Sequence, residues 1–210
     1  MKIGVIDYGM GNLFSVEQAL RRLGCEVIVT ADENELDTAD ALLLPGVGAF
    51  PDAMKRLAET KLDCYLQKVK AENRPLLGIC LGMQLLFEES EEVASTKGLG
   101  FFKGSIKRFS GLSKGKSYRV PHMGWNELVV TNNPTWLQDE APAKYVYFVH
   151  SFYATEIDET ELVAYADYSS IRVPGIVANG SVTGMQFHPE KSGALGVYLL
   201  EQWLKGVAVC

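Results

Sequence analysis

The chain has 210 residues, of which 47% are apolar and 22% charged, and this balance is typical of a globular protein with a sizeable core rather than a disordered or fibrous chain. The net charge is −6, and the Lys and Arg residues are scattered, so we expect neither a nucleic-acid nor an anionic membrane partner. No apolar run approaches the ~18 residues of a membrane span, and the N-terminus lacks a signal-peptide core. We therefore expect a cytoplasmic protein.

The first half of the chain alternates short β-rich runs with helical patterns. Strands are expected at residues 2–6, 25–30, 41–44 and 75–79. A helix is expected after Asn12, which is a favourable N-cap residue, and helical patterns cover about 51–73. Uninterrupted apolar strands that alternate with helices form parallel sheets, whose sites lie at the C-terminal strand ends. The pattern therefore predicts an α/β fold with its site at that edge.

The second half changes to shorter alternating stretches separated by Gly, Pro and Asn, such as NELVV, YVYFVH and SVTGMQF, which predicts partly antiparallel strands. The segments PHMGWN (121–126) and YFVHSF (147–152), the second of which overlaps YVYFVH, look like loops rather than helix faces. A last amphipathic helix is expected over about 193–205, with Leu195, Leu199 and Trp203 on one stripe. No linker or repeat is visible, so residues 1–210 are expected to form a single domain.

Cys80 stands in the sequence Gly78-Ile79-Cys80-Leu81-Gly82, which has the form of a nucleophile elbow with cysteine in place of serine. A sharp turn from strand to helix leaves no room for side chains two positions on either side, which explains both glycines. A helix is predicted from Met83 to Glu88, and its N-terminus would favour a thiolate. The alternative is a buried cysteine beside two chance glycines, and the segment alone leaves both interpretations open.

His188-Pro189-Glu190 follows the predicted strand VTGMQF. Proline favours extended geometry in the residue before it, so His188 and Glu190 should point to the same side. The histidine could then take the proton of a thiol while the glutamate orients the imidazole. The alternative is a surface turn with a solvated glutamate.

Pro45-Gly46-Val47-Gly48 follows the strand at 41–44 directly. Glycines at such a position let backbone N–H groups approach a ligand closely, which suits an oxyanion hole. The alternative is an ordinary turn from strand to helix. The segment DYGMGN (7–12) is an incomplete dinucleotide fingerprint, because Phe14 stands at the third glycine position, and a tight turn explains it equally well.

The histidines and cysteines show no metal-ligand spacing. The histidines at 122, 150 and 188 form no HxxxH pair, and the cysteines at 25, 64, 80 and 210 form no CxxC pair. We therefore expect no metal, no cofactor and free thiols. His122 and His150 are interpreted as structural or surface residues.

The elbow, the PGVG loop and the HPE segment together resemble the class I, triad-type glutamine amidotransferases. The resemblance covers nearly the whole chain, through DYGMGN, LLLPGVGAF, LGICLGMQLL, PHMGWN, YFVHSF and GMQFHPEKS. These segments look like those of the glutaminase subunits of imidazole glycerol phosphate synthase. Other members of the class usually carry a GGPG-like pattern in the oxyanion strand, so PGVG narrows the resemblance to these subunits.

The resemblance implies a mechanism and a set of site residues. Cys80 would attack the side-chain amide of L-glutamine to form a glutamyl thioester, His188 would shuttle the proton to the departing ammonia, and Glu190 would orient His188. The amides of Leu81 and of the Val47-Gly48 segment would form the oxyanion hole. The residues implied to bind glutamine are Gly48, Gln84, Ser151 and Phe152.

The resemblance also implies a partner, the (β/α)8-barrel cyclase of histidine biosynthesis, which makes imidazole glycerol phosphate and AICAR in a heterodimer with the glutaminase. Ammonia released into water at neutral pH is mostly ammonium, so the hydrolysis is productive only beside an acceptor site, and no phosphate-binding motif remains in this chain for one. The implied partner face includes Asn12, Trp125, Tyr147, His150 and Lys191.

We hypothesise that acceptor binding in the cyclase reorganises the PGVG loop and completes the oxyanion hole. The reason is Val47, whose branched side chain sits between the two glycines. Two other functions stay open: another hydrolase of the same fold family, and a catalytically silent regulatory subunit in which Cys80 is structural.

Overall fold

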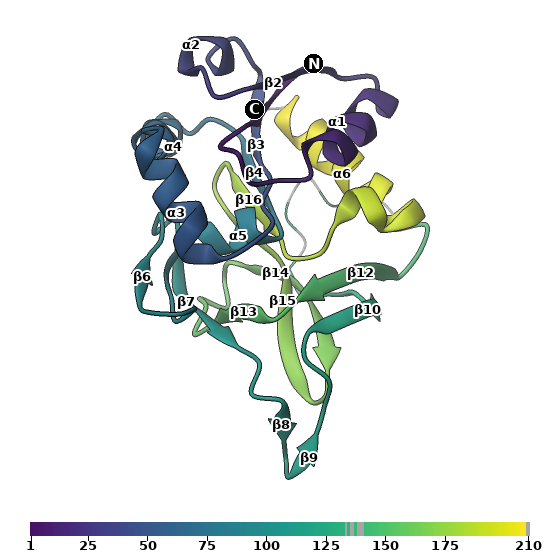
Figure 1. Ribbon diagram of the computed structural model, residues 1–210. Coiled ribbons are helices and arrows are strands. Elements are labelled where there is room, and N and C mark those ends of the chain that lie inside the picture. The colour runs from purple at the N-terminus through teal and green to yellow at the C-terminus, as the bar shows by residue number, and fades with distance from the viewer. Residues whose placement is uncertain (133, 135–136, 138–140, 209–210) are drawn as a thin grey trace.

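An eight-stranded mixed sheet forms the centre of the computed structural model, which describes residues 1–132, 134, 137 and 141–208 (Figure 1). Its strand order is β11-β14-β15-β16-β4-β3-β1-β2. The parallel strands are β1 (Lys2–Ile6), β2 (Glu26–Thr30), β3 (Ala41–Leu44), β4 (Leu76–Ile79) and β16 (Val182–Met185). The antiparallel strands are β15 (Ile171–Asn179), β14 (Leu162–Tyr168) and β11 (Val129–Val130). The four strands predicted in the first half are confirmed.

Helices cover both faces of the parallel part. One face packs against α1 (Leu13–Arg22) and α6 (Gly193–Val207). The other packs against α3 (Phe50–Glu59), α4 (Leu62–Ala71) and α5 (Leu81–Leu85), and a short α2 (Glu33–Leu36) precedes β3. Alternate residues of β3 explain the two cores, because Leu42 and Leu44 join the α3 and α4 side while Ala41 and Leu43 join the α1 and α6 side. The apolar run therefore reads as a strand buried on both faces.

One helix prediction is confirmed and one needs correction. The helical patterns over about 51–73 are the two helices α3 and α4, between which the chain turns at Lys61, a residue with a positive φ of 61°. The helix predicted from Met83 to Glu88 is wrong in its bounds, since α5 starts directly after Cys80 and ends at Leu85. Phe87 then begins a strand whose inward side chain is fully buried, so apolar residues of two different elements had read as one helix.

The remaining strands lie below the parallel part in Figure 1. A four-stranded sheet has the order β13-β7-β5-β6, with β5 (Phe87–Ser90), β6 (Thr96–Lys97), β7 (Phe102–Arg108) and β13 (Phe152–Thr155). A hairpin of β8 (Leu112–Ser113) and β9 (Lys116–Ser117) forms the tip. The partly antiparallel second half is thus confirmed. No helix among the residues described is long and apolar enough to cross a membrane.

The alternating stretch YVYFVH is confirmed as a strand, β12 (Tyr145–His150), whereas PHMGWN, interpreted as a loop, lies mostly in β10 (His122–Glu127). Of YFVHSF, only Ser151 lies outside β12 and β13. The strands β10 and β12 pair antiparallel along their whole length. In β12 every second side chain is buried, at Val146, Phe148 and His150. In PHMGWN, the proline, the glycine and the polar residues at 122 and 126 hide any apolar alternation, which is why this stretch resembled a loop.

Candidate active site

Cys80 sits at the tip of a strained turn between β4 and α5. It has φ 55° and ψ −113°, a backbone conformation that a residue with a side chain adopts rarely. A Cβ on Gly82 would overlap the carbonyl of Leu44, and one on Gly78 would lie 2.8 Å from the carbonyl oxygen of Gly82. Both glycines are therefore required by close backbone approach, as the elbow predicts. The N–H of Cys80 donates to the Met185 carbonyl (2.8 Å), which ties the turn to β16.

His188 and Glu190 form a buried pair. Nδ1 of His188 lies 2.8 Å from Oε1 of Glu190, and the side chains are only 5% and 1% exposed. The predicted contact is present, but by a different path: His188 is extended, whereas Pro189–Lys191 form a 3-10 turn that brings the carboxylate back to the ring. The Ser192 hydroxyl donates to the His188 carbonyl (2.7 Å) and fixes this turn.

The imidazole of His188 is held between two acceptors. Burial alone would lower the pKa of His188, but hydrogen bonds to Cys80 and to Glu190 outweigh it and raise the pKa from its ordinary 6.5 to about 9. Since Nδ1 contacts Glu190, Nε2 is the nitrogen left for the sulfur. The second oxygen of Glu190, Oε2, is buried and has no hydrogen-bond partner among the residues described, so its charge is balanced mainly by the imidazolium.

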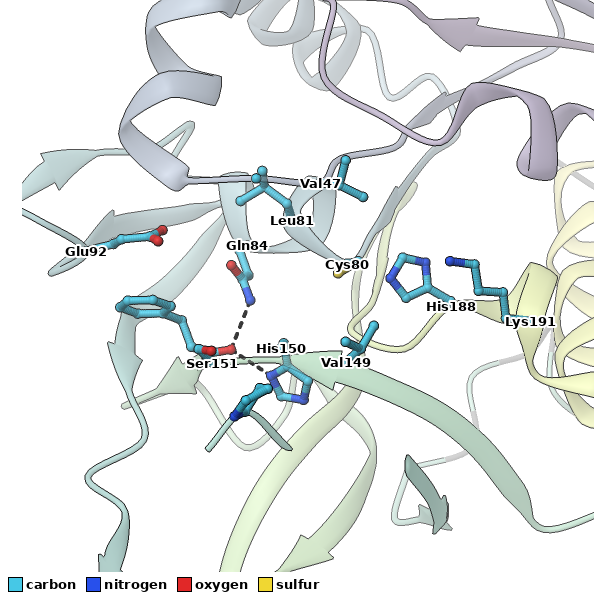
Figure 2. Close-up of a pocket in the computed structure, with 13 residues that line it drawn as sticks. Val47, Cys80, Leu81, Gln84, Glu92, Val149, His150, Ser151, His188 and Lys191 are labelled. Atoms are coloured by element: carbon cyan, nitrogen blue, oxygen red, sulfur yellow. Dashed lines mark hydrogen bonds between the residues drawn. The ribbon is translucent and has the colours of Figure 1, made fainter. Parts of the chain in front are cut away.

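The sulfur of Cys80 opens into a cavity of about 410 Å³ (Figure 2). In this view Cys80 and His188 lie at one side, Glu92 lies at the opposite side, and Gln84 and Ser151 lie between them. The lining residues are Val47, Gly48, Cys80, Leu81, Gln84, Glu92, Pro121, Val149, His150, Ser151, Phe152, His188 and Lys191. The cavity thus brings together every residue that the sequence predicted for the oxyanion hole and for glutamine binding. Its volume is in the range of small-molecule sites.

The PGVG loop packs tightly against the elbow. The Tyr8 hydroxyl donates to the Pro45 carbonyl (2.9 Å), and a Cβ on Gly46 would lie 2.8 Å from the backbone nitrogen of Gly82. Gly48 has φ +111°, and Val47 is 43% exposed at the mouth of the cavity. The loop is therefore held firmly at its start and exposed at Val47.

Gln84 is buried in the cavity wall and both of its amide hydrogens are directed at oxygens. Nε2 lies 3.0 Å from the Phe152 carbonyl and 3.0 Å from Oε1 of Gln186. Its remaining polar atom, Oε1, can only accept a hydrogen bond. Gln84 therefore joins the elbow to β13 and to the segment after β16.

Glu92 is a site residue that sequence reasoning missed. Its Oε2 accepts from the Phe50 N–H (2.8 Å), and its carboxylate places negative charge at the cavity wall opposite Cys80. It belongs to the acidic run at 88–92, and such a run normally indicates a solvated surface. No local signal separates Glu92 from its neighbours.

The residues predicted for a partner face divide into two groups. Trp125 is 55% exposed and packs edge-on against Tyr147, with ring centroids 5.9 Å apart, and Lys191 is also exposed. Asn12 is half-buried and caps α1. His150 does not fit such a face, because it is only 7% exposed and its ring nitrogens contact His122 and the Phe152 carbonyl.

Metal-binding clusters and cysteine thiols were the remaining candidates for site chemistry among the residues described. No group of three or more His, Cys, Asp or Glu side chains there could hold a metal ion. Cys25, Cys64 and Cys80 are free thiols. Cys210, for which the sequence indicated no role, lies outside the residues described.

Comparison with known proteins gives consistent results. The family model described as "Glutamine amidotransferase class-I" matches residues 4–205. The chain is 54% identical over 202 residues to the "Imidazole glycerol phosphate synthase subunit HisH" of Shouchella clausii, covering 96% of each chain. It is 51% identical over 207 residues to the proteins of the same name from Geobacillus kaustophilus and Bacillus subtilis, covering 98% of this chain and 97% of each relative.

Solved structures show the same fold at lower identity. "Structure of PurLQS from Thermotoga maritima" superposes with a TM-score of 0.74 at 23% identity, covering 98% of each chain. "Crystal structure of glutamine amidotransferase" gives 0.72 at 22% identity, covering 97% of this chain and 98% of the other. The elbow, the family model and the near full-length relatives agree, and the chain belongs to the class I glutamine amidotransferase family, within it to the HisH subunits of imidazole glycerol phosphate synthase.

Proposed function

We propose that this chain hydrolyses L-glutamine to glutamate and ammonia with Cys80 as nucleophile. The observation that carries the proposal is the strained Cys80 turn, which opens into the cavity beside the buried His188 and Glu190 pair. Strain of this kind persists where surrounding structure enforces it, and it clusters at active sites. A cysteine paired with an oriented histidine is the activated arrangement for acyl transfer.

The reaction has two steps at Cys80. The sulfur attacks the side-chain amide carbon of glutamine, and the oxyanion that forms is met by the amides of Leu81 and of the Val47-Gly48 segment. His188 delivers its proton to the amide nitrogen, the C–N bond breaks, and ammonia leaves a glutamyl thioester. Water then attacks the thioester with His188 as base, and glutamate is released. Glu190 holds the imidazole in the orientation that both proton transfers need.

The cavity suits an amino acid with an amide side chain. The Glu92 carboxylate lies on the wall opposite Cys80, where it can take the α-ammonium group of the substrate while the amide reaches the sulfur. Gln84 and the Ser151-Phe152 backbone line the wall between these two sides and supply polar contacts along the substrate. A carboxylate on the wall opposite the nucleophile favours a substrate that carries an ammonium group as well as the amide.

The ammonia serves a separate synthase subunit. The relatives are named as subunits of imidazole glycerol phosphate synthase, so we propose the (β/α)8-barrel cyclase of histidine biosynthesis as partner in a cytoplasmic heterodimer. The proposed docking face is the outer side of β10 and β12, where Trp125, Met123 and Tyr145 are 55%, 56% and 53% exposed. A cluster of exposed aromatic residues beside a cavity is typical of an interface. Lys191 and Asn12 complete its rim.

The partner is proposed to control the oxyanion hole. Val47 stands in the exposed part of the PGVG loop, and acceptor binding in the cyclase would reorganise this loop into its active form. Glutamine turnover would then rise when the complex is loaded with acceptor. Equal turnover by the isolated chain and by the loaded complex would contradict this.

The test is Cys80→Ala in the reconstituted complex, with Cys64→Ala, an exposed thiol on α4, as the matched control. Cys80→Ala should abolish synthesis from glutamine and leave synthesis from added ammonia intact, whereas Cys64→Ala should change neither. Loss of both activities in Cys80→Ala would make Cys80 a structural residue. Unchanged activity from glutamine would favour the second candidate, a regulatory subunit without chemistry.

A further inference from the structure

Two buried histidines outside the triad lie at one wall of the glutamine cavity: His150 lines the cavity, and His122 lies behind it. His122 is fully buried and His150 is 7% exposed, and they face one another across β10 and β12. Nδ1 of His122 lies 3.0 Å from Nε2 of His150. The His122 ring is stacked between Phe148 and Tyr168, with centroids 4.6 Å and 4.0 Å away. Polar side chains as buried as these need a hydrogen-bond partner for each polar atom. Neither His122 nor His150 takes part in the glutaminase mechanism.

The pair is part of a longer row of contacts that ends in the cavity wall. At one end, Nδ1 of His150 lies 2.7 Å from the Phe152 carbonyl, which also accepts from Gln84. At the other end, Nε2 of His122 lies 2.8 Å from the side-chain amide of Asn126. The row therefore runs from Asn126, on the strand that carries Trp125, to a carbonyl that lines the substrate cavity.

Counting hydrogens fixes the direction of the row. A carbonyl only accepts, so Nδ1 of His150 carries a hydrogen, and in a neutral ring Nε2 must then accept. Nδ1 of His122 therefore donates to it, and Nε2 of His122 must in turn accept from Asn126. That requires the NH₂ group of Asn126 to face the ring.

The other orientation of Asn126 needs a buried cation. If Oδ1 of Asn126 faces His122, the two rings together need three N–H hydrogens, so one ring must be positively charged. Burial lowers the pKa of both rings, that of His150 to about 3, so neither holds the extra proton at neutral pH. Turning the amide by half a rotation removes the conflict. It gives up a long hydrogen bond, 3.3 Å, to the Asp167 carbonyl and leaves two acceptor oxygens facing each other there, which costs less than a buried uncompensated cation.

We propose that Asn126, His122 and His150 form a one-directional hydrogen-bond relay, with both histidines in the Nδ1–H tautomer, that positions the Phe152 carbonyl and through it Gln84 in the glutamine cavity. All three are positioning residues, since none of them needs to touch the reacting atoms. The role of the relay in glutamine binding rests on the proposed glutaminase function. The tautomers of His122 and His150 are independent of that function, because they are measured without substrate.

The first experiment is a long-range ¹H–¹⁵N correlation on the chain labelled at histidine, recorded from about pH 6 to about pH 9. His122 and His150 should each show a protonated Nδ1 and an unprotonated Nε2 over the whole pH range. The imidazole signals of His188 are identified as those that shift in the Glu190→Gln variant. An Nε2–H tautomer at either residue, or a cationic ring in this range, overturns the relay. The result does not depend on whether the chain hydrolyses glutamine.

The second experiment replaces the donor at the start of the relay. Asn126→Asp keeps the shape but only accepts, so His122 can satisfy both neighbours only as a cation. The new carboxylate raises the pKa of His122, and a raised pKa means that the relay is intact below it and broken above it. The KM for glutamine of the variant complex should therefore rise about tenfold between about pH 6 and about pH 9, relative to the unmodified complex.

Other titratable groups near the pair define the background for this measurement. Those that face the two rings from neighbouring strands and segments are Tyr168, His188 and, around Phe109, Tyr118 and Tyr153. They are present in both proteins, so a ratio of KM values removes their contribution.

The matched control is Asn132→Asp, which makes the same charge change where the amide donates to the Glu159 and Leu162 carbonyls, away from the cavity. It should leave the pH profile of KM unchanged, and ammonia-dependent synthesis should be unchanged in both variants. A profile for Asn126→Asp that matches the unmodified complex contradicts the relay. Absence of glutamine turnover in the unmodified complex would instead contradict the glutaminase function. The tautomer measurement would still test the direction of the relay.

Discussion

The two walls of the glutamine cavity are built in different ways. The wall that carries Cys80 and the PGVG loop comes from two successive strands and the turns that directly follow them, at 78–82 and 45–48. The adjoining wall, with His150, Ser151 and Phe152, comes from strands whose paired residues are 18 or more positions apart in the sequence. One wall is thus specified locally and the other by long-range pairing.

The two walls also differ in what makes them rigid: steric contact fixes the elbow side, and hydrogen bonds fix the strand side. On the elbow side, Gly78 and Gly82 stand where backbone approaches backbone, so a side chain at either position would meet atoms that cannot move aside. On the strand side, the Phe152 carbonyl is fixed by His150 and Gln84 side chains. We therefore expect substitutions on the elbow side to act mainly on folding, and those on the strand side to act mainly on substrate binding.

Gly82→Ala is the strongest test of the steric wall. The new Cβ would overlap the Leu44 carbonyl, a backbone atom that cannot move without displacing β3. The free energy of unfolding should fall by about 4 kcal/mol or more, measured by urea denaturation. The same substitution in the antiparallel half gives the comparison: at Gly175 the new Cβ would meet Cδ1 of Leu128, 2.6 Å away, which is the end of a flexible side chain. Gly175→Ala should lower the unfolding free energy by only about 1–2 kcal/mol, and equal losses would refute the distinction.

Glu190→Gln tests the pair that joins the two walls at His188. The amide keeps the shape but not the charge that stabilises the imidazolium, so kcat for glutamine should fall about 10²-fold to 10⁴-fold in a steady-state assay. The control is Glu17→Gln, which removes a surface ion pair with Arg21 and should leave kcat unchanged.

The same variant should change the pH dependence of stability. Because the pKa of His188 is raised from 6.5 to about 9 in the folded chain, its contribution is complete below 6.5 and is lost as pH rises through about 9. The gap in Tm between the unmodified chain and Glu190→Gln should therefore be large near about pH 6 and small near about pH 10. A difference in Tm that widens as pH rises would contradict the claim that Glu190 stabilises His188 as a cation.

The sequence predicts the locally built wall well and the other wall poorly. The strands at 2–6 and 41–44 have the predicted bounds, because strands buried on both faces are continuous apolar runs. The elbow glycines are likewise a local requirement of the turn. The bounds of α5 were wrong because Phe87, the first residue of β5, continues the apolar run of the helix, so the change from helix to strand leaves no break in that run. That residues 1–210 form one domain stays a prediction.

The strand-built wall depends on pairing that no short segment reveals. His122 and His150 meet only because β10 and β12 are in register, which neither segment indicates by itself. The alternation in YVYFVH predicts the strand β12, and it places His150 on the same inward face as Val146 and Phe148. Glu92 had no such signal, because its role follows from the position of the loop after β5 over the cavity.

Tyr8→Phe is expected to have the smallest effect, and it tests whether the elbow side is rigid throughout. The lost hydroxyl leaves the buried Pro45 carbonyl without its donor, so the free energy of unfolding should fall by about 1–2 kcal/mol. Tyr65→Phe, which removes a hydroxyl hydrogen-bonded to Asp37 and Arg74 away from the cavity, should cost a similar amount or less.

The two variants should differ in function. Since Pro45 begins the PGVG loop, Tyr8→Phe should loosen the loop and reduce the stimulation of glutamine turnover by acceptor about two- to fivefold, while Tyr65→Phe leaves the stimulation unchanged. If both variants keep full stimulation, the start of the loop is fixed by the close packing of Gly46 against Gly82 alone, and any reorganisation is confined to Val47 and Gly48.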